Sequence, residues 1–245
     1  MNIVITAGGT SEKIDSVRKI TNSSSGKLGK IIAETFLKSD LEINTIFYIC
    51  TQKSLKPSSS KVKIILVESA NDLLKEVTKI LTTYSTNLFI HSMAVSDYSV
   101  DYVTTASLLY KGLNKALQNE HSFENFINSN TYVLNREEKI SSQEENIIIK
   151  LKPTPKIISY IKKISPKTRL IGFKLLNSVS KETLIDVGYE LLQKNSCDVV
   201  IANDLSQISK IKHKAFFIDK HKKITEANTK LEIANMLVNY IKNNI

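Results

Sequence analysis

Residues 3–36, IVITAGGTSEKIDSVRKITNSSSGKLGKIIAETF, contain the strongest fold signal in the chain. Ile3 to Thr6 is a short apolar run that predicts a buried strand, and it leads directly into the loop Ala7-Gly8-Gly9-Thr10. Apolar residues at helical spacing follow Gly26, and the serines just before that glycine are natural N-cap residues. We therefore expect a strand, a tight glycine loop and then a helix.

The same alternation continues along the chain. Further strands are expected at 43–49, 62–67, 88–91, 147–151, 170–173 and 198–201, helices at 71–81, 155–164, 181–194 and 229–242, and a hairpin at 215–219 and 222–225. Apolar strands that alternate with helices indicate an α/β class, with a mostly parallel sheet and helices on both faces, which is a Rossmann-like three-layer fold. We expect a single domain over 1–245. The pattern weakens from about 100 to 138, so an insertion or flap is expected there, reaching to about 145.

Composition excludes several classes of protein. Apolar residues make up 42% of the chain, which is enough for a packed core and excludes global disorder. No apolar run approaches the roughly 18 residues of a membrane span, and the first residues do not resemble a signal peptide. Cys50 and Cys197 have no Cys-x-x-Cys spacing, so we expect inert core thiols in a reduced, cytoplasmic protein. The formal charge of +10 suggests a partner with phosphates, but no nucleic-acid-binding motif supports nucleic acid.

Unusual loop residues follow several of the predicted strands. They are Gly8-Gly9-Thr10, Met93 to Asp97, Gly172-Phe173 and Asn203-Asp204. In open α/β sheets, ligands bind beyond the carboxyl ends of the strands. Ser24-Ser25-Gly26 adds the start of a helix, where backbone N–H groups favour phosphate. The spacing fits neither a P-loop nor a Gly-x-Gly-x-x-Gly fingerprint, so these residues alone predict a nucleotide or phosphate ligand.

A more specific signal is the string from Thr6 to Gly29, TAGGTSEKIDSVRKITNSSSGKLG. It resembles the signature of the phosphopantothenate–cysteine ligases of coenzyme A synthesis: Gly-Gly-Thr, then Glu-x-Ile-Asp-x-Val-Arg, then Asn-x-Ser-Ser-Gly-x-x-Gly. The resemblance continues, in order, at residues 94–98 (AVSDY), 139–142 (KISS), 172–174 (GFK) and 202–204 (AND), and so it covers nearly the whole chain.

The resemblance implies a definite reaction. Such ligases activate the carboxylate of 4′-phosphopantothenate on a nucleoside triphosphate, usually CTP in bacteria and ATP in animal relatives. The amine of L-cysteine then attacks the acyl-nucleotide and forms an amide, and the nucleoside monophosphate and pyrophosphate are released. Mg²⁺ is implied because it accompanies the triphosphate, held largely by phosphate and water oxygens. Metal ligands on the protein stay unknown.

The resemblance also implies roles for particular residues. Asn22, Lys139 and Asp97 match catalytic positions, with Lys139 on a flap over the triphosphate. Arg18, Asn22, Met93 and Ala94 match substrate-binding positions, and Arg18 would bind the substrate phosphate across a homodimer. The matching nucleotide-binding positions are Gly8, Gly9, Thr10, Ser24, Gly26, Gly29, Phe173, Asn203 and Asp204.

The sequence departs from the family pattern at two places. Many bacterial relatives have Lys-x-Lys-Lys where this chain has Lys139-Ile140-Ser141-Ser142, so only the first lysine is carried over. Met93 stands where Ala is common. Many bacterial relatives are fused to an N-terminal flavin-dependent decarboxylase half, whereas this chain begins directly at the ligase strand. It therefore resembles the stand-alone type, and we expect the decarboxylase to be a separate protein.

The main alternative is an NAD(P)-dependent reductase of Rossmann type. The short-chain reductases need Tyr-x-x-x-Lys, and no Tyr in this chain has a Lys four residues later. His91 ends a predicted buried strand, where a structural histidine is favoured over a catalytic one.

Overall fold

The computed structural model describes residues 1–118, 123–128, 131–209 and 211–244. These residues form two compact units. The first comprises Met1–Thr10, Asn22–Val95 and Lys156–Ile245, and the second comprises Ser11–Thr21 and Ser96–Pro155. No pattern in the sequence predicts that 11–21 belongs to a different unit from the residues on either side of it. Whether the units act as the single domain expected from the sequence stays a prediction.

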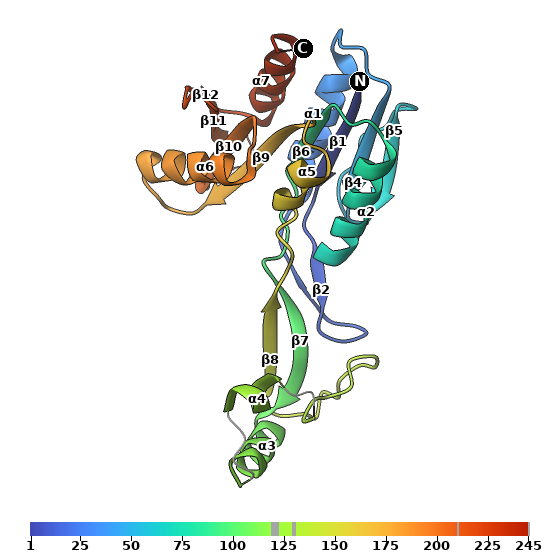
Figure 1. The fold of residues 1–245 in the computed structure, drawn as a ribbon, viewed down its shortest axis with the longest axis vertical. Helices are drawn as coiled ribbons and strands as arrows, with labels where there is room; N and C mark the ends of the chain where they lie inside the picture. Colours follow the sequence, from blue (N-terminus) through green and yellow to red (C-terminus); the bar gives the residue numbers. More distant parts are fainter. Residues whose placement is uncertain (119–122, 129–130, 210, 245) are drawn as a thin grey trace. The chain divides into compact units, whose positions relative to one another are not determined.

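An eight-stranded sheet forms the centre of the first unit (Figure 1). Six neighbouring strands run parallel, and the last two at one edge are antiparallel to their neighbours. In spatial order the strands are β12 (Ile224–Ala227), β11 (His213–Asp219), β10 (Val199–Ile208), β9 (Arg169–Leu176), β6 (Leu88–His91), β1 (Asn2–Ala7), β4 (Thr45–Cys50) and β5 (Val62–Leu66).

Helices cover both faces of this sheet. On one face α1 (Lys27–Lys38) and α7 (Lys230–Lys242) pack on a core of buried aliphatic and aromatic side chains. On the other face lie α2 (Ala70–Thr83), α5 (Ile158–Ile164) and α6 (Lys181–Asn195). Alternate residues of β1 serve the two cores, with Ile3 and Ile5 facing α1 and Val4 facing α2. The predicted Rossmann-like three-layer fold is confirmed.

The strand order places a switch point beside β1. The chain passes from β1 outward to β4 and β5, and then returns to β6 on the other side of β1. In open α/β sheets such a point leaves a crevice outside the carboxyl ends of the two central strands. The loops that follow β1 and β6 are therefore the first place to look for a ligand.

The second unit is built on a two-stranded antiparallel ribbon of β7 (Tyr98–Thr105) and β8 (Ile147–Pro153), with α3 (Ala106–Gln118) and α4 (Phe123–Asn128) at one end (Figure 1). A short hairpin of β2 (Ser11–Lys13) and β3 (Lys19–Thr21) also belongs to it. A small core gathers Val100, Val103 and Ile140.

Several expectations need correction. The strand expected at 147–151 exists, but β8 pairs with β7 and not with the main sheet, and its side chains are largely exposed. A strand inside a parallel sheet would be buried on both faces. The N-cap position of helix α1 is Gly26, in the left-handed conformation, and not a serine. The nearest serine, Ser25, lies one residue earlier, and its Oγ accepts from the Lys27 N–H at 3.4 Å. Strand β10 runs on to Ile208, past the end expected at 201.

None of the helices in the described ranges combines the length and apolar character needed to cross a membrane.

Candidate functional site

The loops after β1 and β6 are joined by backbone hydrogen bonds. The Ala94 N–H donates to the Gly8 carbonyl at 2.8 Å, and the Thr10 N–H donates to the Ala94 carbonyl at 3.1 Å. Gly9 and Ala94 form a parallel bridge. These bonds extend the sheet pairing beyond the two strands, so the loops at the switch point have fixed positions.

Asn22, which lies just before α1, closes onto the same two loops. Its backbone N–H donates to the Thr10 carbonyl at 3.1 Å, and its side-chain Nδ2 donates to the Ala94 carbonyl at 3.3 Å. A Cβ on Gly9 would lie only 2.0 Å from the backbone oxygen of Asn22. Gly9 is therefore required for Asn22 to approach this closely, and three segments that are distant in sequence meet here.

Gly8 and Gly26 both have positive φ angles, +90° and +71°, which glycine adopts without strain. A Cβ on Gly8 would also lie 1.9 Å from Ser54 Oγ, which shares a 2.7 Å hydrogen bond with Thr51 Oγ1. Gly29, inside α1, would place a Cβ 2.6 Å from that of Ala7. Contacts within the protein thus account for Gly8, Gly9 and Gly29, and their role in nucleotide binding stays a prediction.

At the start of α1, the Lys27 N–H donates to Ser25 Oγ at 3.4 Å. Gly26 provides no side chain to cap the helix, and the first turn contains no acidic residue. Ser24 is exposed just before it. The N-terminal end of a helix favours an anion through its N–H groups and its dipole, and phosphate binding at this end of α1 stays a prediction.

His91 is a bonded structural residue at the end of β6, as expected. Its Nδ1 shares a 2.9 Å hydrogen bond with Thr6 Oγ1, and the Met93 N–H donates to the same hydroxyl oxygen at 3.3 Å. Burial lowers the pKa of His91 to about 4, so the ring is neutral near pH 7. Met93 itself is 7% exposed and packs into the core beneath α2.

Residues at the ends of β9 and β10 divide between the two faces of the sheet. Phe173 packs on the core under α1 and α7, and Asn203 shares that face by strand alternation. Asp204 points to the opposite face. Its carboxylate accepts hydrogen bonds from the N–H groups of Ser178 and Val179 and from both the N–H and Oγ of Ser206.

These bonds, with that from the Ser206 hydroxyl the strongest, hold the pKa of Asp204 well below its usual range. The carboxylate ties the β9–α6 loop to β10. Because Asp204 and Asn203 face opposite sides of the sheet, the position of Asn203 does not support the predicted role of Asp204 as a nucleotide ligand.

Asp15 is the centre of a bonded cluster in the second unit. Its buried carboxylate accepts from Arg18 Nε at 2.8 Å and from Arg18 Nη2 at 2.5 Å. It also accepts from the N–H groups of Val17, Arg18 and Ile140. The Arg18 side chain holds the pKa of Asp15 well below its usual range. Because Arg18 Nη2 also donates to the Ile140 carbonyl at 2.9 Å, much of the guanidinium expected to bind substrate is engaged within its own unit.

Lys139 and Asp97 are also residues of the second unit. Lys139 is exposed on a loop, next to the anchored Ile140. Asp97 is exposed, and its backbone carbonyl accepts from the Thr154 N–H at 3.0 Å. The predicted site residues therefore fall into two sets, with Arg18, Asp97 and Lys139 in the second unit and all the others in the first.

Sequence reasoning missed residues that hold the loops. Thr6, Ser54 and Asp15 each bond or pack against predicted site residues, as described above. Ser54 follows β4, so its place at a strand end was a usable signal. Arg136 donates to the carbonyls of Lys13, Ile14, Val100 and Asp101, and nothing in the sequence marked it.

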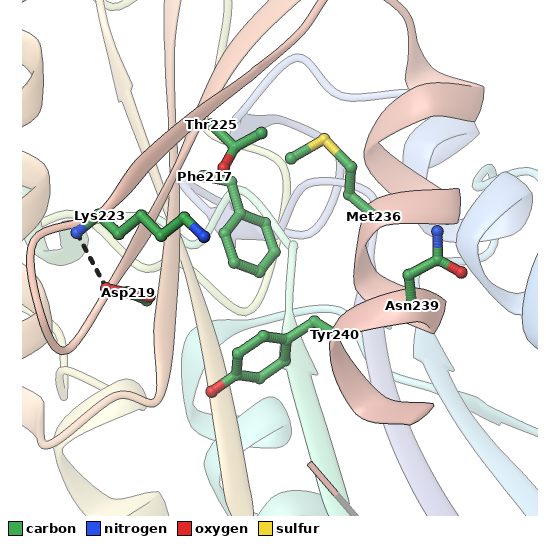
Figure 2. Close-up of a pocket in the computed structure, with 7 residues that line it drawn as sticks. All are labelled: Phe217, Asp219, Lys223, Thr225, Met236, Asn239 and Tyr240. Atoms are coloured by element: carbon green, nitrogen blue, oxygen red, sulfur yellow. Dashed lines mark hydrogen bonds between the residues drawn. The ribbon is translucent and has the colours of Figure 1, made fainter. Parts of the chain in front are cut away.

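The cavity beside α7 lies away from this site. It has a volume of about 220 Å³ and is lined by Phe217, Asp219, Lys223, Thr225, Met236, Asn239 and Tyr240 (Figure 2). Asp219 pairs with Val199 at the start of β10, which places the cavity toward the amino ends of the parallel strands. Ligand pockets usually measure roughly 300–1,000 Å³. Neither its size nor its position suits a nucleotide.

Within the described ranges, no three His, Cys, Asp or Glu side chains gather closely enough to hold a metal ion.

Comparison with known proteins gives consistent matches over the whole chain. Residues 1–120 and 131–245 match the family described as "DFP: DNA/pantothenate metabolism flavoprotein C-terminal domain". The crystal structure of the DNA/pantothenate metabolism flavoprotein from Streptococcus pneumoniae is 41% identical, with a TM-score of 0.83 and full coverage of both chains.

Two curated relatives are named "Coenzyme A biosynthesis bifunctional protein CoaBC". The one from Methanocaldococcus jannaschii is 30% identical over 98% of this chain and 50% of its own length. The one from Thermococcus kodakarensis is 30% identical over 96% of this chain and 49% of its own length. The chain thus spans about half the length of these curated relatives. By the family match over both segments, the chain belongs to the family of DNA/pantothenate metabolism flavoprotein C-terminal domains.

Proposed function

We propose that this chain is a phosphopantothenate–cysteine ligase. In the proposed reaction, a carboxylate oxygen of 4′-phosphopantothenate attacks the α-phosphorus of CTP, and pyrophosphate leaves with the electron pair of the broken P–O bond. The cysteine amine then attacks the acyl carbon of the acyl-cytidylate. An amide forms, a proton is lost from nitrogen, and CMP leaves.

The observation that carries the proposal is the junction at Ala94. The glycine loop after β1, the Asn22 segment and the loop after β6 all bond to one another there. These are the three segments that hold the ligase signature from Thr6 to Gly29 and its continuation at 94–98. The relatives named for coenzyme A biosynthesis support the same reaction.

The chemistry requires positioning and charge neutralisation more than a protein nucleophile, because the substrate supplies its own carboxylate. We propose that Asn22, Met93 and Ala94 bind the pantothenoyl portion. The Asn22 amide can both donate and accept hydrogen bonds, which suits an acyl group whose oxygen gains charge.

The nucleotide would bind on the α1 side of the sheet. We propose that the N–H groups at Gly26 and the adjacent Ser24 bind phosphate oxygens. Phe173 and Asn203, which share the α1 and α7 face, would hold base and ribose. Mg²⁺ would enter with the triphosphate as part of the substrate, which agrees with oxygen ligands supplied mainly by phosphate and water.

For the second unit, the proposed roles come from the family resemblance. Lys139 would neutralise the triphosphate, Asp97 would line the reacting centre, and Arg18 would bind the substrate phosphate across a homodimer. Two free, buried thiols, Cys50 and Cys197, agree with a proposed cytoplasmic location.

Product analysis tests this proposal. The purified chain is incubated with phosphopantothenate, L-cysteine, Mg²⁺ and either CTP or ATP, and CMP or AMP and pyrophosphate are quantified. We expect equal amounts of CMP and pyrophosphate, formed only when all substrates are present, with CTP used faster than ATP. Absence of both products under saturating substrates would exclude the proposed activity.

A further inference from the structure

His213, the first residue of β11, is buried without a hydrogen-bonding partner. Its side chain is 6% exposed, and neither ring nitrogen has a partner among the described residues. Buried polar groups are nearly always hydrogen-bonded, so an orphaned imidazole requires an explanation. By strand alternation His213 lies on the same face as Ala215 and Phe217, which is the face covered by α1 and α7.

Two lysines lie at the starts of the helices on this face. Lys230 is the first residue of α7, and Lys27 is the first residue of α1. Burial, helped by the positive charge of Lys230, lowers the pKa of His213 to about 4. Burial, helped by the positive charge of Lys27, also lowers the pKa of Lys230. Lys230 thus lies near both His213 and Lys27, and its charge is opposed by each of them when they are protonated.

Among the residues that the structure describes, acidic groups do not neutralise this cluster. No carboxylate in the described part of the chain forms an ion pair with Lys27 or Lys230. Glu226, on the neighbouring strand β12, pairs with Lys214 at 3.0 Å on the opposite face of the sheet. Glu232 of α7 is engaged by the Asn228 N–H at 2.8 Å and by Thr229 Oγ1 at 3.1 Å.

The cluster also lies at the carboxyl edge of the sheet. His213 pairs with Ile208 at the end of β10, and its N–H donates to the Asn228 carbonyl, just before α7 begins. The N-termini of α1 and α7 therefore both point to this edge. Both helices are longer than ten residues, and each carries a partial positive charge at its N-terminus.

We propose that Lys27, Lys230 and His213 form an anion site that binds a phosphate group. The two lysines would supply charge, and the imidazole would supply the hydrogen-bond donor that now has no acceptor. A phosphate would remove the repulsion among the lysines and satisfy the buried ring in a single step.

The source of the phosphate is a nucleoside triphosphate. Phe173 and Asn203, proposed above to hold base and ribose, lie on the same sheet face as His213, and Gly26 adjoins Lys27 in the chain. The choice of a nucleoside triphosphate as the ligand rests on the proposed function, whereas the anion site itself does not. Phosphopantothenate also carries a phosphate group, and the experiment therefore includes it.

Anion binding and protonation of His213 are coupled. A bound phosphate favours the charged imidazolium, so the site takes up a proton when it fills, and reciprocity means that binding weakens as pH rises. The carboxylates of Glu226 and Glu232 are held by their own partners, so the coupling proposed here concerns the protonation of His213.

Calorimetric titrations of the full chain with Mg-CTP, inorganic pyrophosphate and phosphopantothenate test the site. Lys230→Met is compared with Lys167→Met, which removes an exposed lysine from the turn just before β9, at the opposite edge of the sheet. We expect Lys230→Met to weaken the affinity for Mg-CTP and for pyrophosphate about tenfold or more. Its affinity for phosphopantothenate, and all three affinities of Lys167→Met, should change less than twofold. A loss of affinity in Lys230→Met that is confined to phosphopantothenate, or no loss of affinity for any of the three ligands, would overturn the proposal.

A second measurement does not depend on the variant folding. The imidazole proton signals of His213 in the wild-type chain, assigned with His213→Gln, are followed against pH with and without pyrophosphate. The proposal requires the pKa of His213 to rise when pyrophosphate binds, and an unchanged pKa would refute it. If the ligase assay fails but Lys230→Met still weakens the binding of Mg-CTP and pyrophosphate, only the proposed function is refuted. If Lys230→Met turns over normally and binds CTP with unaltered affinity, only this site is refuted.

Discussion

Substituting Gly9 by alanine should separate the loops at the switch point. The new Cβ would lie 2.0 Å from the Asn22 oxygen, and real Cβ contacts essentially never fall below 3.0 Å, so the Asn22 backbone must move by about 1 Å. That shift would break the Asn22 hydrogen bonds to the Thr10 and Ala94 carbonyls. Strain of about 1–3 kcal/mol and two lost hydrogen bonds of about 1 kcal/mol each indicate destabilisation by about 3–5 kcal/mol.

The same movement should reduce turnover. Displacing a positioning group by 1 Å costs about 10²-fold in rate, so the variant should retain roughly a hundredth of the wild-type kcat/KM. Urea unfolding and pyrophosphate release are measured for Gly9→Ala and for Ser23→Ala, an exposed neighbour of Asn22 that should behave as wild type. Wild-type stability and turnover in Gly9→Ala would refute the close approach of Asn22 as a requirement of the site.

Three further predictions concern other parts of the chain. Lys139→Ala should lower turnover about 10²-fold by leaving phosphate charge unneutralised, while the exposed neighbour Glu138→Ala should not; equal turnover in the two variants, measured as pyrophosphate release, would remove Lys139 from the site. Arg18→Ala and Asn22→Ala, each weak alone, should regain up to about a quarter of wild-type activity when subunits exchange at equal ratio, because half the dimers then hold one intact site; no recovery despite demonstrated exchange would argue for self-contained subunits. Stability should fall as the pH drops from about 6.5 to 4, because the unfolded chain protonates His91 and His213 in this window and the folded chain does not, by up to about 3 kcal/mol for each histidine. Urea unfolding at several pH values should show a flatter dependence in His91→Gln combined with His213→Gln, and an unchanged slope would contradict the assignment.

The fold could be predicted where local signals agree. The apolar run of β1, its glycine loop and the spacing of α1 all indicate the same strand–loop–helix unit, and the structure has it. The pairing of β8 could not be predicted, because periodicity identifies a strand but not its partner. Strands β2 and β3, of three residues each, are too short for a pattern to form.

The reasons for the glycines could not be derived from the sequence. Gly8 approaches Ser54, and Gly9 approaches Asn22, and such contacts exist only after the sheet has assembled. The Asp15–Arg18 pair has a spacing that sequence reasoning could have used. The third partner, Ile140, comes from a segment more than a hundred residues away.

The charge and the histidines show the same limit. A net charge of +10 indicates an anionic partner but not where it binds. His213 has no motif around it, and only its orphaned ring beside Lys230 distinguishes it from a surface histidine.

The most direct test of the central claim is an isotope-transfer measurement. Phosphopantothenate labelled with ¹⁸O at both carboxylate oxygens is turned over with CTP and L-cysteine, and the CMP is analysed by mass spectrometry. Attack of the carboxylate on the α-phosphorus predicts one ¹⁸O in each CMP released, with the other retained in the amide carbonyl. Turnover that yields unlabelled CMP would show that the carboxylate is not activated as an acyl-nucleotide, and would contradict the account.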